Sequence, residues 1–187
     1  VFGPEGRGLC AQLGVTPDVL IGGLGKACGA QGGFVACARE FRGWLWNRAR
    51  SLVFSTAPSP LVTGLTLSQL ARLRAAVGDR QHLLAMSDRL ADALERAGVA
   101  LPPHRHGPIF PIIFGSEGAA MSAAAATREF GVRCHPIRPP TVPSGSSRLR
   151  VTLRADMTRD VVGRIAEAVV SAWKSVGFLC PCGDHGG

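Results

Sequence analysis

The hydrophobic positions in residues 1–80 form short apolar runs that are separated by turns rich in glycine and proline. The run that follows Asp18 is rich in leucine and β-branched residues and stops at glycines, which predicts a buried strand. The run over 32–37 predicts a second strand that returns beside the first. From these patterns and the helical spacing of other apolar residues, we expect helices over 9–13, 39–50 and 61–77 and strands over 19–21, 32–37 and 51–56.

The second part of the chain carries longer helical periods. One broad face of a helix over 80–97 gathers Leu83, Leu84, Met86, Leu90, Leu94 and Ala97, and Gly98 then ends this helix. The apolar run 108–114 contains prolines, which predicts a strand at the edge of a sheet. We also expect helices over 119–130 and 157–176 and strands over 132–137 and 148–154. This alternation indicates an α/β fold in which a small sheet carries helices on one side.

Length and composition limit the possible classes of protein. A chain of 187 residues suits one ordinary domain or two small ones, and 46% hydrophobic against 18% charged residues allows a packed core. The sequence contains no apolar run of membrane-spanning length and no basic-then-apolar leader, so we expect neither a membrane span nor a signal peptide. The location that this pattern favours is the cytoplasm, and in that compartment the six cysteines remain thiols.

The net charge of +8 raises the question of nucleic-acid binding. The arginines are scattered singly along helical segments, and neither a dense basic run nor an aromatic-basic alternation is present. We therefore do not expect a nucleic-acid partner. The tail with Cys180, Cys182 and His185 has too few ligands, too closely spaced, for an ordinary zinc site, so we expect no metal there.

Lys26 is the candidate for chemistry, because it lies among glycines between two apolar runs. A lysine in such a turn is poorly hydrated and becomes a better amine nucleophile. Arginine cannot form a Schiff base, and the chain has only one other lysine, Lys174. An ordinary lysine at the end of a strand points into water, so the residue type alone does not decide between these two interpretations.

The pattern D-x-L-x-G-x-x-G-K-A-x-G-x-x-G-G over 18–33 resembles the cofactor-lysine segment of the α-oxoamine synthases. These are pyridoxal-phosphate (PLP) enzymes with the aspartate-aminotransferase-like α/β fold, and the resemblance implies that Lys26 binds the cofactor covalently. It covers roughly the second half of the family's subunit, up to about Val176. The chain then comprises the end of the large PLP-binding domain over 1–80, the small carboxyl-terminal domain over 81–177 and a flexible tail over 178–187.

The same resemblance implies further cofactor contacts. Ser55 and Thr56 end a predicted strand, where hydroxyl groups ordinarily just cap or turn the chain. In the α-oxoamine synthases the matching Ser-Thr pair reaches the PLP phosphate of the neighbouring subunit, which implies a homodimer with active sites at the interface. Family members commonly have threonine at the position of Gly23. The glycine lacks that hydroxyl, although its backbone amide could partly replace the lost phosphate contact.

The segment Ile-Arg-Pro-Pro-Thr-Val-Pro around Arg138 is the second informative motif. Adjacent prolines limit the conformations of Arg138, and a guanidinium held in this way suits bidentate binding of a carboxylate. The segment, with Arg148-Leu-Arg150 after it, resembles the biotin-pathway members of the family. By that resemblance Arg138 holds the carboxylate of L-alanine, Thr141 lines the site for a pimeloyl thioester, and Arg150 is a second carboxylate candidate.

The implied reaction is a decarboxylative condensation of L-alanine with pimeloyl-CoA or pimeloyl-acyl carrier protein, in which Lys26 also acts as a base. Two alternatives stay open. One is another α-oxoamine synthase that joins glycine or serine to a different acyl donor. The other is a catalytically dead remnant or a partner that only forms dimers, because the residues that hold the cofactor ring in this family belong to the half that precedes this sequence. The fragment alone is expected to be inactive.

Overall fold

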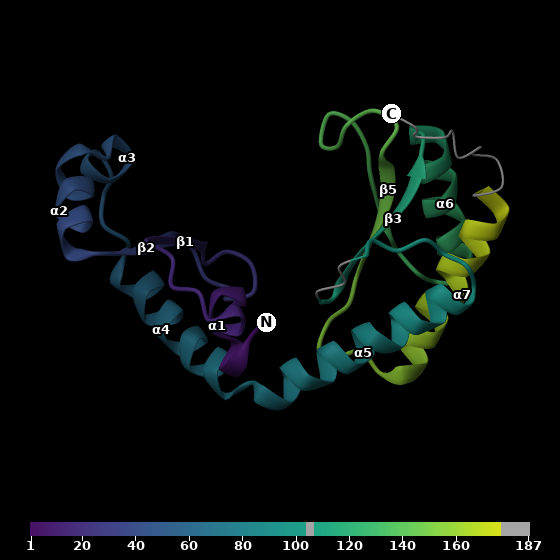
Figure 1. The fold of residues 1–187 in the computed structure, drawn as a ribbon, viewed down its shortest axis with the longest axis horizontal. Coiled ribbons are helices and arrows are strands. Elements are labelled where there is room, and N and C mark those ends of the chain that lie inside the picture. The colour runs from purple at the N-terminus through teal and green to yellow at the C-terminus, as the bar shows by residue number, and fades with distance from the viewer. Residues whose placement is uncertain (104–106, 177–187) are drawn as a thin grey trace. The chain divides into compact units, whose positions relative to one another are not determined.

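The computed structural model describes residues 1–103 and 107–176, and its ribbon is shown in Figure 1. The chain divides into two compact units, Val1–Arg80 (unit 1) and Gln81–Gly187 (unit 2). Each unit is built from both helices and strands. The correspondence of these units to a large and a small domain stays a prediction, as does the tail over 178–187, which lies outside the described residues.

Unit 1 is a chain of small elements around one β-hairpin. Strands β1 (Val19–Gly23) and β2 (Gly33–Cys37) pair antiparallel, with Val19 opposite Cys37 and Gly23 opposite Gly33. This confirms the predicted returning strand. The remaining elements are η1 (Pro4–Gly6), α1 (Leu9–Leu13), α2 (Arg39–Arg48), α3 (Arg50–Val53) and α4 (Pro60–Ala75). Helices α1, α2 and α4 match the predicted ranges to within two residues, and Gly14 ends α1 in a left-handed conformation at φ 66°.

Two predictions for unit 1 are wrong. The strand after Asp18 is exposed rather than buried, and Ile21 retains 76% of its accessible surface. The structure describes every residue of unit 1, and Cys28 is the only hydrophobic side chain there that is buried. Unit 1 therefore has no second layer that covers β1 and β2. The predicted strand over 51–56 is instead helix α3 followed by a turn. Its backbone amides at Val53 and Phe54 donate to the carbonyls of Ala49 and Arg50, since no neighbouring strand offers a ladder to this segment.

Unit 2 is a three-stranded sheet with the strand order β3-β5-β4. The strands are β3 (Ile109–Gly115), β4 (His135–Ile137) and β5 (Ser147–Thr152), and both pairings are antiparallel. Strand β3 lies at an edge, as its prolines predict. Strands β3 and β4 are both antiparallel to β5, so they run in the same direction. Their carboxyl ends therefore lie at the same end of the sheet, on either side of β5.

Three helices cover one face of this sheet (Figure 1). Helix α5 (Val77–Arg96) is followed two residues later by Gly98, which has φ +78° as its predicted capping role requires. Helix α6 (Glu117–Glu129) contacts all three strands, and α7 (Arg159–Val176) packs against α6. The predicted helices and the one-sided sheet of unit 2 are therefore confirmed.

Alternation along the strands separates the core from the exposed face of the sheet. Leu149 and Val151 of β5 and Ile112 of β3 point to the helices and are buried, whereas Arg148 and Arg150 lie on the opposite face. The core is completed by Leu90 and Val169 from the helices. This arrangement leaves the arginines of β5 accessible to a ligand.

Candidate active site

Lys26 lies in the connection between β1 and β2. The amide of Leu24 donates to the Gly32 carbonyl, the amide of Ala30 to the Leu24 carbonyl and the amide of Gly29 to the Lys26 carbonyl, each at 2.9 Å. Gly29 and Gly32 have φ values of 61° and 96°, which only glycine adopts without strain. The Lys26 side chain is exposed. The prediction of a poorly hydrated lysine is therefore wrong for this chain, in which Lys26 is accessible to solvent.

The other predicted cofactor residues are also in unit 1. Gly23 ends β1, and a Cβ added there would meet no atom within 4 Å, so the glycine leaves open space where a threonine side chain would fit. The Ser55 hydroxyl donates to the Leu52 carbonyl at 3.0 Å, as an ordinary turn residue does. The Thr56 hydroxyl is exposed and makes no hydrogen bond to the described residues.

These residues fit part of a PLP site. An accessible primary amine at Lys26 can bond the cofactor aldehyde, while the free hydroxyl of Thr56 and the open space at Gly23 suit a phosphate group. The sequence predicts no residue of this chain that would hold the cofactor ring. Unit 1 would therefore supply the covalent anchor and part of a phosphate site if PLP binds as the resemblance implies.

Arg138 follows β4 in a tight turn. The Thr141 amide donates to the Arg138 carbonyl at 3.1 Å around a cis bond between Pro139 and Pro140, which is the geometry of a type VI turn. The guanidinium Nη1 of Arg138 lies 3.8 Å from Oε2 of Glu117. Thr141 is exposed. The turn thus presents both predicted substrate residues, Arg138 and Thr141, from one short segment.

Arg150 lies in the middle of the central strand, between Pro111 of β3 and His135 of β4. Its side chain is exposed on the sheet face opposite the helices. Arg148 shares that face and donates from Nε to the Ser146 carbonyl at 2.9 Å. The exposed sheet face and the turn that follows β4 therefore gather three arginines in unit 2, at positions 138, 148 and 150.

The predicted residues are divided between the two units. Lys26 and Gly23 belong to one hairpin of unit 1, with Ser55 and Thr56 in the same unit. Arg138, Thr141 and Arg150 belong to the β4–β5 region of unit 2. Sequence reasoning missed Glu117, the carboxylate that faces Arg138. The order strand-helix-strand over 109–137 could have indicated Glu117, because this order places the start of α6 beside the end of β4.

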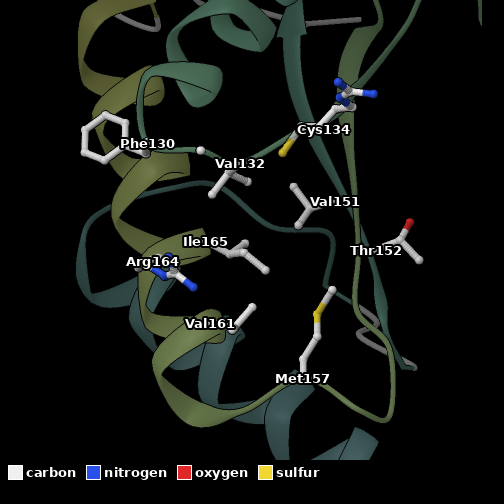
Figure 2. Close-up of a pocket in the computed structure, with 11 residues that line it drawn as sticks. Phe130, Val132, Cys134, Val151, Thr152, Met157, Val161, Arg164 and Ile165 are labelled. Carbon is white, nitrogen blue, oxygen red and sulfur yellow. The ribbon is translucent and has the colours of Figure 1, made fainter.

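The pocket shown in Figure 2 lies elsewhere in unit 2, between α7, β5 and the segment after α6, and has a volume of about 210 Å³. Ile165, Met157 and Val151 point into the same space (Figure 2), and none of the predicted site residues lines it. Burial raises the pKa of the Cys134 thiol in this lining, although a hydrogen bond with the Thr127 side chain acts in the opposite direction. A protonated, buried thiol is a packing group rather than a nucleophile.

The described residues offer neither a metal site nor a membrane-spanning helix. The described residues contain no group of three or more His, Cys, Asp or Glu that could hold a metal ion, and the tail with Cys180, Cys182 and His185 lies outside them. The four cysteines in the described ranges are free thiols. Among the helices that the structure describes, none combines the length and apolar character needed to cross a bilayer.

Comparison with known proteins places the chain in a family. Residues 1–169 match the model of the family described as aminotransferase class I and II. The chain belongs to this family. Its 8-amino-7-oxononanoate synthase relatives include that of Chlorobaculum parvum, 39% identical over 91% of this chain and 44% of that protein. The relative from Anaeromyxobacter dehalogenans is 45% identical over 83% of this chain and 39% of that protein.

Solved structures agree with this family and with the predicted fold class. Serine palmitoyltransferase from Sphingomonas wittichii has a TM-score of 0.82 and 27% identity, over 95% of this chain and 45% of that chain. A serine palmitoyltransferase solved with PLP has a TM-score of 0.84 and 25% identity, over 95% of this chain and 45% of that chain. The expected α/β fold is thus confirmed, as part of the family's fold, and the chain spans less than half the length of these relatives.

Proposed function

We propose that this chain is the carboxyl-terminal part of a PLP-dependent acyltransferase, 8-amino-7-oxononanoate synthase, which acts in biotin biosynthesis. The enzyme would condense L-alanine with pimeloyl-CoA or pimeloyl-acyl carrier protein and release carbon dioxide. The observation that carries this proposal is the similarity, at 39% and 45% identity over most of this chain, to two proteins of that name. The accessible amine of Lys26 and the turn that presents Arg138 and Thr141 support it.

Each residue has a role that follows from its chemistry. Lys26 would hold the cofactor through Nζ, with Gly23 near its phosphate group, whereas Ser55 and Thr56 would reach the phosphate of the cofactor in the neighbouring subunit. When bound, PLP supplies an electron sink for the carbanion at Cα of the amino acid. Lys26 Nζ would accept the proton that leaves Cα. Arg138 would orient the alanine carboxylate, which is a positioning effect rather than a bond-making one.

The acyl donor and the second subunit complete the proposal. Thr141 would line the site for the pimeloyl thioester, and Arg150 is a second candidate for a carboxylate. We propose that residues 1–80 belong to the large domain and 81–177 to the small domain of the subunit. The active enzyme would be a cytoplasmic homodimer in which Thr56 reaches the cofactor phosphate of the neighbouring subunit.

Titration of the 187-residue chain with PLP tests the anchor. We expect a visible absorption band and, after borohydride reduction and peptide mapping, an adduct on Lys26. The chain offers a matched control, since Lys174 is also exposed and is the only other lysine. Lys26→Ala should abolish the adduct, whereas Lys174→Ala should leave it unchanged. An adduct shared equally between the two lysines would contradict the assignment of Lys26.

Another α-oxoamine synthase activity is a second candidate, favoured by the structural similarity to serine palmitoyltransferase. Product mass distinguishes the two candidates when the intact subunit receives alanine, glycine or serine together with pimeloyl-, acetyl- or palmitoyl-CoA. We expect product only from alanine with the pimeloyl thioester. Product from serine and palmitoyl-CoA would replace the biotin assignment with the second candidate.

The remaining alternative is a chain that forms dimers but binds no cofactor. Gly23 favours this alternative, because it leaves open space where the resembling family commonly has a threonine hydroxyl. It predicts neither an absorption band nor an adduct from the chain, together with a dimer in sedimentation experiments. The PLP titration of the chain and of the intact subunit therefore separates it from the enzyme proposal.

A further inference from the structure

The guanidinium of Arg138 already faces a carboxylate of the protein itself. Oε2 of Glu117 lies 3.8 Å from Nη1 of Arg138, and the two side chains are 56% and 55% exposed. The topology of unit 2 creates this pair. Glu117 begins α6 just after β3, and Arg138 directly follows β4. The carboxyl ends of these two strands lie at the same end of the sheet.

Glu117 is held in this position by its place at the start of α6. It is the first residue of α6, where the positive end of the helix dipole stabilises a negative charge. The Ser116 hydroxyl caps the same helix by accepting from the Ala119 amide at 3.1 Å. The start of the helix is therefore fixed by its own hydrogen bonds, and the carboxylate of Glu117 is held beside the turn that carries Arg138.

We propose that Glu117 pairs with the Arg138 guanidinium before substrate binds, competes with the substrate's carboxylate for it and gives way when that carboxylate binds. This inference rests on the proposed function, in which Arg138 binds the carboxylate of L-alanine. Two carboxylates beside one guanidinium repel each other, so substrate binding breaks the pair with Glu117. Breaking the Glu117–Arg138 pair lowers the affinity for L-alanine only slightly, because an exposed ion pair is weak.

Steady-state kinetics of the intact subunit test the exchange. Glu117→Gln keeps the size of the side chain but removes the competing charge. We expect the KM for L-alanine to fall about two- to fivefold, the range for release of one exposed ion pair, with kcat unchanged. The difference should shrink at high ionic strength, which screens the exposed pair.

The matched control is Glu129→Gln at the other end of α6. Glu129 is exposed and lies on the same helix, so this variant removes one negative charge without touching the pair. A KM for Glu117→Gln that equals the control value, or exceeds that of the unmodified protein, overturns the proposal. Glu117→Asp separates pairing from helix stability, because it keeps the charge at the helix start but withdraws the carboxylate from Arg138. We expect it to lower KM as well, by a smaller factor.

A second measurement needs no catalysis and uses the 187-residue chain. An arginine-selective dicarbonyl reagent modifies exposed guanidinium groups, and peptide mass gives the rate at Arg138. We expect propionate to protect Arg138 in Glu117→Gln at a concentration about two- to fivefold lower than in Glu129→Gln. Equal protecting concentrations overturn the role of Glu117. Absence of product from alanine and pimeloyl thioester would instead overturn the proposed function, and the protection measurement would still decide the role of Glu117.

Discussion

Unit 2 buries a continuous core, whereas unit 1 leaves most of its apolar side chains exposed. In unit 2, Leu90, Ile112 and Leu149 are completely buried between three helices and one face of the sheet. In unit 1, which the structure describes in full, Cys28 is the only buried hydrophobic residue. Its largest exposed apolar side chains include Trp44, Trp46, Phe54 and Leu61. Both units have regular helices and strands, so the difference lies in the second layer that a core requires.

The comparison explains why one unit should be stable alone and the other should not. Hydrophobic burial is the main favourable contribution to folding, and unit 1 has little of it. The β1–β2 hairpin has too few strands to be stable by itself in water. The chain spans less than half the length of its relatives. We therefore expect the apolar surface of unit 1 to be covered by polypeptide that precedes this sequence in the intact subunit.

The largest expected effect is a difference between two leucines on helices. Leu90 of α5 is completely buried in unit 2, whereas Leu61 of α4 is 84% exposed in unit 1. Leu90→Ala should lower the free energy of unfolding by about 2–5 kcal/mol, because it leaves a cavity in the core. Leu61→Ala should change it by less than about 0.5 kcal/mol. Urea denaturation of the chain, followed by circular dichroism, measures both values.

Equal losses for the two leucine variants would contradict the comparison. That result would mean that the surface around Leu61 is buried in solution, by self-association for example. Repeating the denaturation over a range of protein concentrations tests this point, since burial between copies makes the midpoint depend on concentration. The midpoint of a chain with one autonomous core should not depend on concentration.

Proteolysis should show the next largest difference. Arg48 and Arg50 lie at the junction of α2 and α3 in unit 1, whereas Arg148 and Arg150 lie on the central strand of unit 2. Trypsin requires an unfolded segment, so cleavage follows local opening. We expect cleavage after the first pair to be at least about tenfold faster than after the second. Mass spectrometry of timed digests of the same sample gives the two rates. Comparable rates would show that unit 2 opens as readily as unit 1.

Local signals in the sequence were sufficient for most elements. Proline within 108–114 predicts an edge strand because it cannot donate to a ladder, and β3 lies at the edge. Gly98 predicts the end of α5 because a left-handed residue closes helices there. Each of these signals depends on the backbone chemistry of a single residue, which does not require knowledge of the tertiary structure.

Burial and strand pairing could not be predicted in the same way. The run over 19–21 is apolar enough for a core, yet Ile21 is exposed because no layer of unit 1 covers it. The segment 51–56 has strand-like composition but forms α3, since strand formation depends on a neighbouring strand. The sequence also singled out Arg138 without its partner Glu117. These two residues meet only because the carboxyl ends of β3 and β4 lie at the same end of the sheet.

The smallest effect concerns two serines with the same local role. Ser59 caps α4 in unit 1 by accepting from the Val62 amide at 3.3 Å, and Ser116 caps α6 in unit 2 by accepting from the Ala119 amide at 3.1 Å. Ser116→Ala should lower the free energy of unfolding by about 1 kcal/mol, because α6 is part of the cooperative core. Ser59→Ala removes an equivalent hydrogen bond, but α4 buries no side chain. Its loss should therefore change the main unfolding transition by less than about 0.5 kcal/mol.

Replacement by aspartate provides the control for the capping experiment. Aspartate restores an acceptor at the helix start, so Ser116→Asp should recover most of the stability that Ser116→Ala loses. A loss that persists in Ser116→Asp would indicate packing rather than capping at this position. If Ser59→Ala destabilises the chain as much as Ser116→Ala, then α4 unfolds together with the core of unit 2. The two units would in that case behave as one cooperative structure, contrary to the difference in burial from which these predictions follow.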